Sequence, residues 1–352
     1  MTDKLIRIID YIKDNNLDGV LITSMPNAFY MAGFTGDNVL LFISSDKQLL
    51  ITDSRYTLQA AEQSPEYQLI TAKGSLIGEL KDMNLKKLGF EGDAVSCNQL
   101  VDFRRSLESC EFCDISEVLR EIRLVKAEEE LDKIRKAAHI ADRAFSHILS
   151  FAKIGMTEKE IALEIEFFMR KNGAEGVSFD TIVAAAEHGA MPHAEPGDRA
   201  IKNGDCVVMD FGCKYQGYCS DMTRTIFFGE PDEKQLVVYN AVLEAQKIAL
   251  SNIRVGVSAK SVDQSARDSL KKTDMDKYFT HSLGHGVGVE VHEGPRLSPY
   301  SNAVLKSGMV VTVEPGVYID GFVGVRIEDL VIVNENGCEN VTKSSKDIII
   351  MQ

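Results

Sequence analysis

The first third of this 352-residue chain alternates short apolar runs with segments of helical spacing. Apolar side chains at Leu5, Ile6, Ile9 and Ile12, with charged residues between them, predict an amphipathic N-terminal helix. Runs rich in Val, Leu and Ile predict strands at 20–23, 39–43, 49–52 and 88–90, and helical spacing predicts helices at 54–63, 75–83 and 97–108. Such alternation predicts an α/β layer with a mixed sheet.

Longer elements follow a boundary near residues 120–127. A Glu-rich start followed by Leu131 and Ile134 in helical register predicts a long amphipathic helix over 128–150. Further helices are predicted at 157–172, 233–252 and 258–272, and apolar strands at 181–186, 206–214, 217–228, 309–319 and 323–333. We therefore predict a chain of α/β (α+β) class, with one domain at 1–122 and a second at 123–352, in which helices flank a sheet. Residues 128–228 and 233–333 each contain a helix pair and a hairpin, which suggests an ancient duplication.

Five polar residues interrupt the apolar, β-branched runs of the second domain: Asp210, Asp221, His285, Glu314 and Glu328. A charge on a buried strand is costly unless a cation or proton compensates it. With a turn at 214–216, the two aspartates are nearly symmetric and are expected to face each other across a hairpin. The two glutamates repeat the arrangement on strands joined through Gly316 and Gly321. Like charges so placed are unfavourable without a bridging cation.

Either acidic pair alone could be solvated surface. Two pairs on strongly apolar strands, with a Gly-flanked histidine between them, favour a site for two metal ions instead. Carboxylates with one imidazole suit Mn²⁺, Co²⁺, Fe²⁺ or Zn²⁺, and the lack of cysteine ligands disfavours a structural zinc centre. Two divalent ions would neutralise four carboxylates and lower the pKa of water towards neutrality. This chemistry predicts hydrolysis.

Composition and charge limit the remaining classes. The chain is 44% hydrophobic and 26% charged, as in ordinary globular proteins, and its net charge of −14 disfavours nucleic acid and anionic membranes as partners. It contains no run of about 18 apolar residues that would span a membrane. Seven scattered cysteines fit a reducing cytoplasm. Cys110 and Cys113 form a C-x-x-C pair, which we interpret as unpaired thiols in a strand rather than a zinc or redox site.

The ordered contexts MDFG, SDMTRT, GHGVG, VEPG and RIED resemble the proline-specific branch of the "pita-bread" metallopeptidases. That group contains prolidase, aminopeptidase P and methionine aminopeptidase, with creatinase as a related non-peptidase. The resemblance covers essentially the whole chain, because NAFYMAGFTG and TDSRY resemble the N-terminal domain of creatinase and prolidase. It implies a creatinase/prolidase-like α/β domain followed by a catalytic pita-bread domain, whose curved antiparallel sheet is flanked by helices.

The resemblance also implies a metal-binding role for each of the five residues. Asp210 would bind one ion, His285 and Glu314 the other, and Asp221 and Glu328 would bridge the two. The ions would be two divalent metals per chain, with Mn²⁺ preferred and Co²⁺, Fe²⁺ or Zn²⁺ as alternatives.

Catalytic roles are predicted for four residues, of which His193 and His292 match positions of the family. His193, in MPHAEP, would donate to the scissile region of the substrate, and His292, in VHEGP, would contact the carbonyl and the developing oxyanion. Glu314 would also carry a proton from the attacking water to the proline nitrogen. Arg326 would orient the Glu328 carboxylate or a substrate group. His281 is interpreted as a group behind the ligands or in the pocket wall rather than as a ligand.

The implied activity is hydrolysis of the bond between an N-terminal residue and a following proline by a hydroxide that bridges the metals. The partner is a proline-containing peptide, and the implied assembly is a homodimer. Arg296 could pair with the free carboxylate of an Xaa-Pro dipeptide, which slightly favours dipeptides over longer peptides. The alternatives are a methionine-aminopeptidase-like or creatinase-like hydrolase, and a non-catalytic member that binds peptide or protein. The extra N-terminal domain disfavours a methionine aminopeptidase. The complete set of metal ligands disfavours a creatinase-like hydrolase and a non-catalytic member.

One position departs from the family pattern. Many relatives have asparagine five residues before the histidine of the proline loop, where this chain has His188. We therefore expect different hydrogen bonding inside this loop, with an effect on substrate preference rather than on the metal site.

Overall fold

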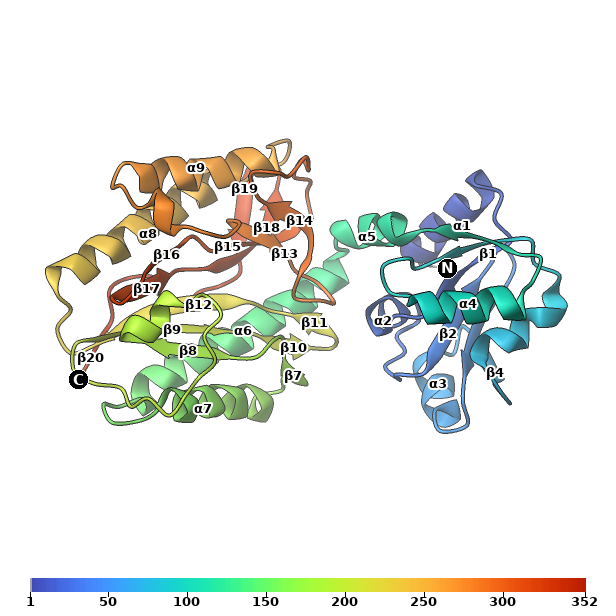
Figure 1. The fold of residues 1–352 in the computed structure, drawn as a ribbon, viewed down its shortest axis with the longest axis horizontal. Helices are drawn as coiled ribbons and strands as arrows, with labels where there is room; N and C mark the ends of the chain where they lie inside the picture. Colours follow the sequence, from blue (N-terminus) through green and yellow to red (C-terminus); the bar gives the residue numbers. More distant parts are fainter. Residues whose placement is uncertain (1) are drawn as a thin grey trace. The chain divides into compact units, whose positions relative to one another are not determined.

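The computed structural model describes residues 2–352 and divides into two compact units, of which the first ends at Arg123 and the second runs from Leu124 to Gln352. The first unit is built on a mixed six-stranded sheet in the order β4-β3-β2-β1-β5-β6, as its alternating pattern predicted (Figure 1). Its strands are β1 (Gly19–Ile22), β2 (Val39–Ile43), β3 (Gln48–Thr52), β4 (Gln68–Thr71), β5 (Lys87–Phe90) and β6 (Glu111–Asp114). Its helices are α1 (Asp3–Asp14), α2 (Met25–Ala32), α3 (Thr57–Gln63), α4 (Cys97–Ser106) and α5 (Ser116–Leu124), and η1 (Leu76–Met83) is a 3₁₀-helix.

Three elements of this unit were not predicted, namely α2, α5 and β4, and β6 was expected only as the strand around Cys110 and Cys113. The two strands lie at the edges of the sheet and none of their residues is fully buried, so they lack the apolar runs that mark the inner strands. Helix α2 is short, and the residues that cap its two ends stabilise it. Ser24 accepts a hydrogen bond from the Asn27 amide at one end, and Gly33 adopts a left-handed conformation (φ 74°) at the other.

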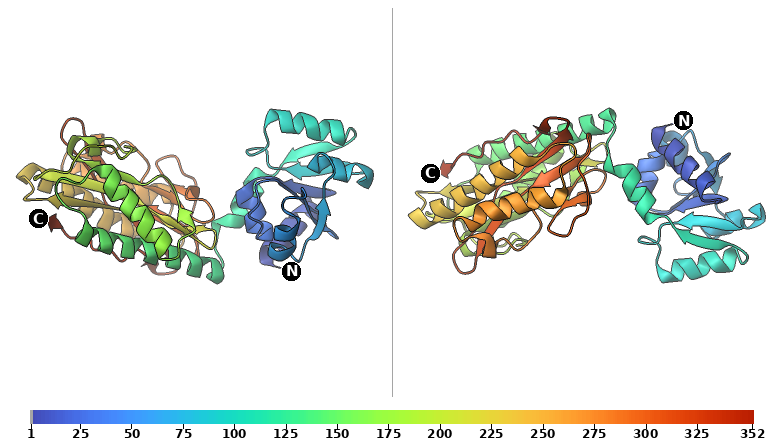
Figure 2. Two further views of the ribbon diagram at one scale, coloured as in Figure 1. Left: turned by 90° about the horizontal axis from the view of Figure 1, so that it is seen from below. Right: turned by 90° about the horizontal axis from the view of Figure 1, so that it is seen from above.

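The second unit packs helix pairs on both sides of its sheets. The view from below shows α6 (Glu128–Phe151) and α7 (Glu158–Lys171) in front, and the view from above shows α8 (Glu233–Asn252) and α9 (Ala259–Lys271) (Figure 2). Each pair forms its own hydrophobic cluster with the sheet residues beneath it. The strands between them are β7 (Gly176–Val177), β8 (Ile182–Ala185), β9 (Asp205–Phe211), β10 (Cys213–Tyr215), β11 (Tyr218–Cys219), β12 (Met222–Phe228), β13 (Gly284–Gly286), β14 (Glu293–Leu297), β15 (Val310–Val313), β16 (Gly316–Ile319), β17 (Val323–Arg326), β18 (Asp329–Asn334), β19 (Gly337–Asn340) and β20 (Ile350–Met351), with 3₁₀-helices η2 (Ala186–Ala190) and η3 (Asp276–Tyr278). All strand pairs except β12–β20 are antiparallel, which agrees with the fold expected for this part.

Each of the four longest predicted strands is divided into two shorter strands. The breaks lie at Gly212, at Ser220–Asp221, at Glu314–Pro315 and at Ile327–Glu328. Three of the four breaks therefore contain a candidate metal ligand. A residue outside the ladder can direct its carboxylate differently from its strand neighbours, so the breaks make the ligand geometry possible.

The two halves of this unit repeat the same local hydrogen bonds. The Gly155 amide donates to the Ile201 carbonyl (2.8 Å) just before α7, and the Gly256 amide donates to the Leu305 carbonyl (2.9 Å) just before α9. An isolated antiparallel bridge follows at each place, between residues 157 and 200 and between 258 and 304. The repeated arrangement suggested by the sequence is thus present in the structure, and its origin by duplication remains a prediction.

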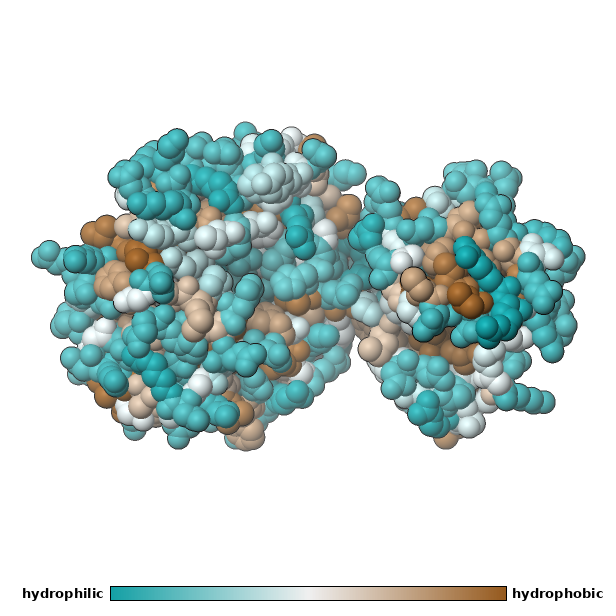
Figure 3. All heavy atoms as spheres, viewed as in Figure 1, coloured by the Kyte–Doolittle hydropathy of each residue, from teal (hydrophilic) through white to brown (hydrophobic). Residues whose placement is uncertain are grey.

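The surface of the described residues is mostly polar in the orientation of Figure 1, with apolar residues scattered over it (Figure 3). Among residues 2–352, no helix combines the length and apolarity needed to cross a membrane.

A close backbone contact joins the strand β17 to the 3₁₀-helix η2. A Cβ atom at Gly324 would lie 1.7 Å from the carbonyl oxygen of Gly189, where no flexible side chain can give way. We expect Gly324→Ala to lower the free energy of unfolding by about 1–3 kcal/mol, as overpacking does, in a denaturant titration. The matched control is Gly74→Ala, because a Cβ atom there meets nothing within 4 Å. Equal midpoints for both variants would contradict the prediction.

Candidate metal centre

The second acidic hairpin places Glu314 and Glu328 opposite each other. In the ladder between β15 and β18, Val313 pairs with Asp329, and the ladder between β16 and β17 continues in the same register on the far side of the break. The shared register makes the two glutamates direct partners across the break, as the sequence symmetry predicted. Their carboxylates belong to neighbouring strands rather than to separate surfaces.

The first acidic hairpin has a different register from the one expected. Asp210 pairs with Thr223, and the same register sets Asp221 against Gly212, where a Cβ atom would collide with the Ser220 carbonyl. The prediction that the two aspartates face each other directly is wrong. The reason lies in the turn, which is formed by Gln216–Gly217 with φ values of 47° and 78° and is therefore centred one residue later than predicted.

The five predicted ligands nevertheless lie together. Ligand atoms of Asp221, His285 and Glu328 lie within 4.8 Å of one another, a grouping that could hold a metal ion. The His285 Nε2 atom is 3.6 Å from Asp221 Oδ2 and 3.3 Å from Glu314 Oε1. The charge of Asp210 acts on Asp221 and Glu328 at short range and raises the pKa of both carboxyls. Two hairpins from the two halves of the unit thus direct their acids into one place.

Three carboxylate oxygens in this group are buried and find no hydrogen-bond donor among residues 2–352: Asp210 Oδ1, Asp221 Oδ1 and Glu328 Oε1. A buried oxygen with this charge and no partner is strongly unfavourable unless a cation binds it. His285 Nδ1 lies 3.1 Å from the Gly286 carbonyl, and donation to that oxygen leaves the Nε2 lone pair available to a metal. The donor set therefore fits divalent cations.

Protonation of the site follows from its burial and its crowding. Burial and the neighbouring carboxylates raise the pKa values of Asp221 and Glu328 well above their ordinary range. Burial also raises the pKa of Glu314, but the hydrogen bond and charge of His285 outweigh it, so that the net pKa is lowered. Burial lowers the pKa of His285, and the hydrogen bond to Glu314 more than reverses this effect.

Two threonines that were not predicted to belong to the site hold the glutamates. Thr223 Oγ1 donates to Glu328 Oε2 (2.7 Å). Thr312 Oγ1 donates to Glu314 Oε1 (3.1 Å) and accepts from the backbone amide of His285 (3.0 Å). Threonine is common in strands, so no sequence signal separates these two from residues that only pack.

Arg326 is fully buried and forms hydrogen bonds with four groups around the acids. Its guanidinium forms an ion pair with Asp210, and it donates to Thr223 Oγ1 (3.1 Å), to the Tyr318 hydroxyl (2.7 Å) and to the Pro192 carbonyl (3.2 Å). Its hydrogen-bonded carboxylate is thus Asp210 and not Glu328, which was one of the two partners predicted, the other being a substrate group. The arginine supplies one positive charge to the cluster and leaves most of the negative charge uncompensated.

The histidines around the predicted metal ligands divide into two kinds. His193 and His292 are exposed to solvent, and the His292 ring lies edge-to-face against His285 with centroids 4.3 Å apart. Partial burial of its ring and the charge of His285 lower the pKa of His292, which favours its neutral form. Arg296, also exposed, lies close enough to lower that pKa further. His281 is instead held at the back of the site, with Nε2 2.9 Å from the Tyr318 hydroxyl.

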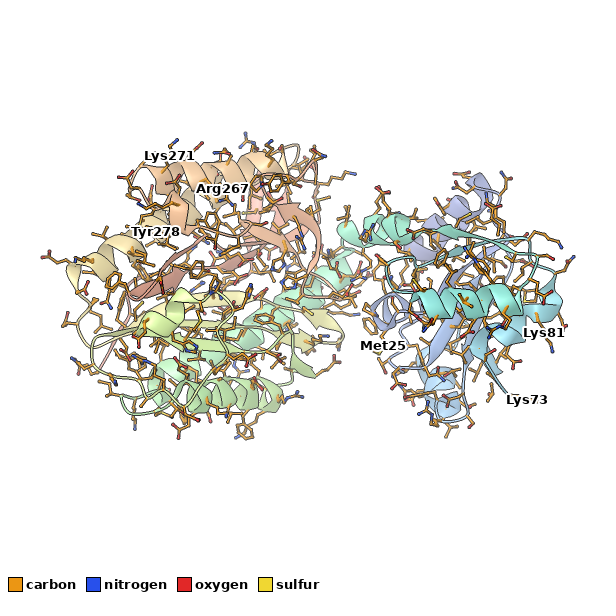
Figure 4. The ribbon with its side chains drawn as sticks, in the orientation of Figure 1. Met25, Lys73, Lys81, Arg267, Lys271 and Tyr278 are labelled. Atoms are coloured by element: carbon orange, nitrogen blue, oxygen red, sulfur yellow. The ribbon has the colours of Figure 1, made fainter. Side chains whose placement is uncertain are left out.

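The segment before His285 is fixed by an ion pair on α9. Asp263 is fully buried, and it accepts from Arg267 and from the Leu283 amide (3.0 Å). Arg267, labelled on α9 in Figure 4, also donates to the carbonyls of Phe279 and His281. The spacing of the pair is that of an ordinary surface ion pair, so its role could not be recognised from the sequence.

The C-x-x-C pair shows no feature of a reactive site. Cys110 and Cys113 are both free thiols, and burial raises the pKa of each, that of Cys110 to about 11. A raised pKa keeps the thiol protonated and unreactive.

Comparison with known proteins identifies the family. Residues 132–335 match the model of metallopeptidase family M24, and residues 4–125 match the creatinase/prolidase N-terminal domain. The chain is 38% identical to an Xaa-Pro dipeptidase of Pyrococcus furiosus, over 99% of this chain and 100% of that protein. Among solved structures it is similar to an Xaa-Pro dipeptidase from Bacillus anthracis (42% identity, 99% of each chain, TM-score 0.95) and to an X-Pro aminopeptidase from Thermotoga maritima (39% identity, 99% and 100% of the chains, TM-score 0.92). The resemblance seen in the sequence is thus confirmed, and the chain belongs to metallopeptidase family M24, with a creatinase/prolidase N-terminal domain.

Proposed function

We propose that this protein is a metal-dependent peptidase that cleaves the bond between an N-terminal residue and a following proline. The observation that carries the proposal is that four carboxylates and one imidazole lie together. Three oxygens of these carboxylates are buried and have no hydrogen-bond donor in the described part of the chain. Membership of family M24 and the names of the similar proteins support the substrate class. Ordinary peptidases handle this bond poorly, because proline fixes φ and its nitrogen carries no hydrogen.

We assign two divalent ions to the site, with Mn²⁺ as the preferred metal and Co²⁺, Fe²⁺ and Zn²⁺ as alternatives. Asp210 would hold one ion, His285 and Glu314 the other, and Asp221 and Glu328 would lie between them. The number of ions is supported by charge, since four carboxylates and the single Arg326 guanidinium leave an excess of negative charge that one divalent ion does not fully balance. When bound, the ions lower the pKa of water and polarise the scissile carbonyl.

The remaining residues handle the peptide and the proton. The exposed His193 and His292 would contact the substrate on either side of the scissile bond, and a neutral His292 can donate a hydrogen bond to the developing oxyanion. Glu314, whose lowered pKa keeps it ionised, would accept the proton of the attacking water and pass it to the proline nitrogen. Arg326 would fix Asp210, and through the Pro192 carbonyl the loop that bears His193.

We also propose a cytoplasmic homodimer. The cytoplasmic location is supported by seven cysteines that are all free thiols within the described structure, as expected in a reducing compartment. The dimer rests on the family resemblance.

The first prediction from this proposed function concerns metal and pH. The ion-free fold raises the pKa values of Asp221 and Glu328 above their unfolded values of about 4. In that state the folded protein binds more protons than the unfolded chain, so this contribution to stability is present below pH ~4 and is lost as the pH rises towards the folded values. Divalent ions bind the ionised carboxylates, so the rise in melting temperature on adding Mn²⁺ should grow between about pH 5 and pH 7. Melting curves of chelated protein, with and without Mn²⁺, measure this difference.

Elemental analysis of the reloaded protein should find about two ions per chain. Glu328→Gln should take up less metal and show a smaller rise in melting temperature. Absence of bound metal after reloading would contradict the assignment.

The second prediction concerns activity. With Mn²⁺ present, the protein should hydrolyse an Xaa-Pro dipeptide, an Xaa-Pro-Xaa tripeptide or both. Glu328→Ala should lower kcat by more than about 10²–10³-fold, because loss of a metal ligand should cost more than the removal of a single hydrogen-bond donor to the transition state, which causes a loss of that size. Glu335→Ala, at an exposed turn on the same chain segment, is the matched control and should retain wild-type rates. Near-normal activity of Glu328→Ala would exclude the metal assignment, and a wild-type protein that cleaves neither peptide would exclude the proposed function.

The third prediction concerns peptide length. If Arg296 pairs with the free carboxylate of the dipeptide, Arg296→Ala should reduce kcat/KM for Xaa-Pro by about tenfold or more, since hydrogen bonds to charged groups are strong. The tripeptide, whose carboxylate lies one residue further on, should lose much less. Arg254→Ala, another exposed arginine, serves as control. Equal losses for the two peptides would remove this role from Arg296.

A further inference from the structure

The loop that carries His193 runs between β8 and β9 and is closed by a single buried carboxylate. Glu158, the first residue of α7, is fully buried. Its Oε1 accepts from the Ala185 amide (2.8 Å) at the start of the loop, and its Oε2 accepts from the Gly197 amide (3.0 Å), four residues after His193. One side chain outside the loop thus joins the two sides of the segment that contains His193.

His188 completes this arrangement from inside the loop. Its Nδ1 atom lies 2.9 Å from both carboxylate oxygens of Glu158. The helix N-terminus and the three donors stabilise a charge that burial would otherwise disfavour. Loss of one donor would leave a buried anion with an unmet acceptor, which is more costly than loss of an exposed hydrogen bond.

The middle of the loop is held against the hairpin that bears Arg326. The Gly189 carbonyl packs directly against Gly324 of β17, and the Pro192 carbonyl accepts from the Arg326 guanidinium (3.2 Å). The residue after Pro192 is the exposed His193. The position of the His193 backbone is therefore determined by contacts on both sides.

We propose that Glu158 and His188 are positioning residues, which hold the His193 loop in the geometry needed for the substrate. The proposal rests on the proposed function in one respect, namely that His193 contacts the peptide. A side chain that must meet a transition state is effective only when its backbone is already in place, and a displacement of about 1 Å can cost about 10²-fold in rate.

This role revises the expectation that histidine, in place of the asparagine of many relatives, changes the hydrogen bonding inside the loop. In both side chains a nitrogen donor is attached to Cγ, so the asparagine of a His188→Asn variant would present its Nδ2 close to the place of the imidazole Nδ1. The hydrogen bond to Glu158 needs a donor at this point and not an imidazole. His188→Asn should therefore preserve the function of the loop, whereas His188→Leu, which has similar bulk and no donor, should not.

The test compares Glu158→Gln, His188→Leu and His188→Asn with the wild-type protein reloaded with Mn²⁺. Gln offers an amide NH₂ where a carboxylate oxygen accepted, so at least one of the backbone bonds is lost. We expect Glu158→Gln and His188→Leu to lower kcat for an Xaa-Pro peptide by about 10–100-fold with a smaller change in KM, and His188→Asn to stay within about threefold of wild type. Glu160→Gln is the matched control on the same turn of α7, because its carboxylate bonds to Thr157 at the start of the helix and not to the loop.

A double-mutant cycle separates positioning from general stability. In a His193→Ala background, adding His188→Leu or Glu158→Gln should change kcat by less than about twofold, because the group that they position is absent. Full additivity of the two losses would overturn the proposal, and so would wild-type activity of both His188→Leu and Glu158→Gln. If Glu158→Gln does not fold, the His188 pair of variants alone decides the question.

Amide exchange gives a measurement that does not depend on the substrate. Exchange at Ala185 and Gly197 should be faster in Glu158→Gln and His188→Leu, and unchanged in His188→Asn and Glu160→Gln. Unchanged exchange in the first two variants would overturn the positioning role of Glu158 and His188. If wild-type protein cleaves no Xaa-Pro peptide, the proposed function fails, and the exchange data still decide whether the loop is held in this way.

Discussion

The catalytic unit is organised around a set of carboxylates that the fold buries side by side. Burial of one unpaired carboxylate is costly, and like charges in contact raise that cost. The threonine hydroxyls and the Arg326 guanidinium compensate part of the charge, yet Asp210, Asp221 and Glu328 each keep an oxygen to which no described residue donates. A fold of this kind is complete only with cations, so structural integrity and chemical activity share one requirement.

The interruption of the long strands is the means by which two hairpins meet this requirement. A continuous ladder would alternate side chains strictly between two faces, whereas the breaks at Asp221, Glu314 and Glu328 release these residues from that alternation. The helix pairs on the outside then fix the hairpins from behind. Asp263 on α9 holds the strand that leads to His285, and Glu158 on α7 holds the loop that leads to His193. Corresponding helices in the two halves thus support different parts of one site.

Much of the architecture could be predicted from the sequence, because periodicity marks buried elements clearly. The inner strands of both units and the long helices carry strong apolar patterns, while the edge strands β4 and β6 are too exposed to show one. The predicted ligands were visible in the sequence because an acid in a β-branched run is rare. The pairing of Asp210 with Thr223 could not be predicted, because it depends on a turn formed by two residues of positive φ, Gln216 and Gly217. A shift of the turn by one position changes the cross-strand partner of every residue in the hairpin. The roles of Thr223 and Thr312 depend on three-dimensional neighbours alone.

The common register of the two ladders around Glu314 and Glu328 limits how this hairpin can change in length. One additional residue in either arm would shift its carboxylate out of register with its partner across the break, so the arms tolerate no insertion. The exposed tip at Asp320–Gly321 lies beyond the last pair of the ladder and is free of this restriction. The tip is therefore the part of the hairpin where natural variants can acquire extra residues, and where an engineered tag can be inserted while the pairing of the arms is retained.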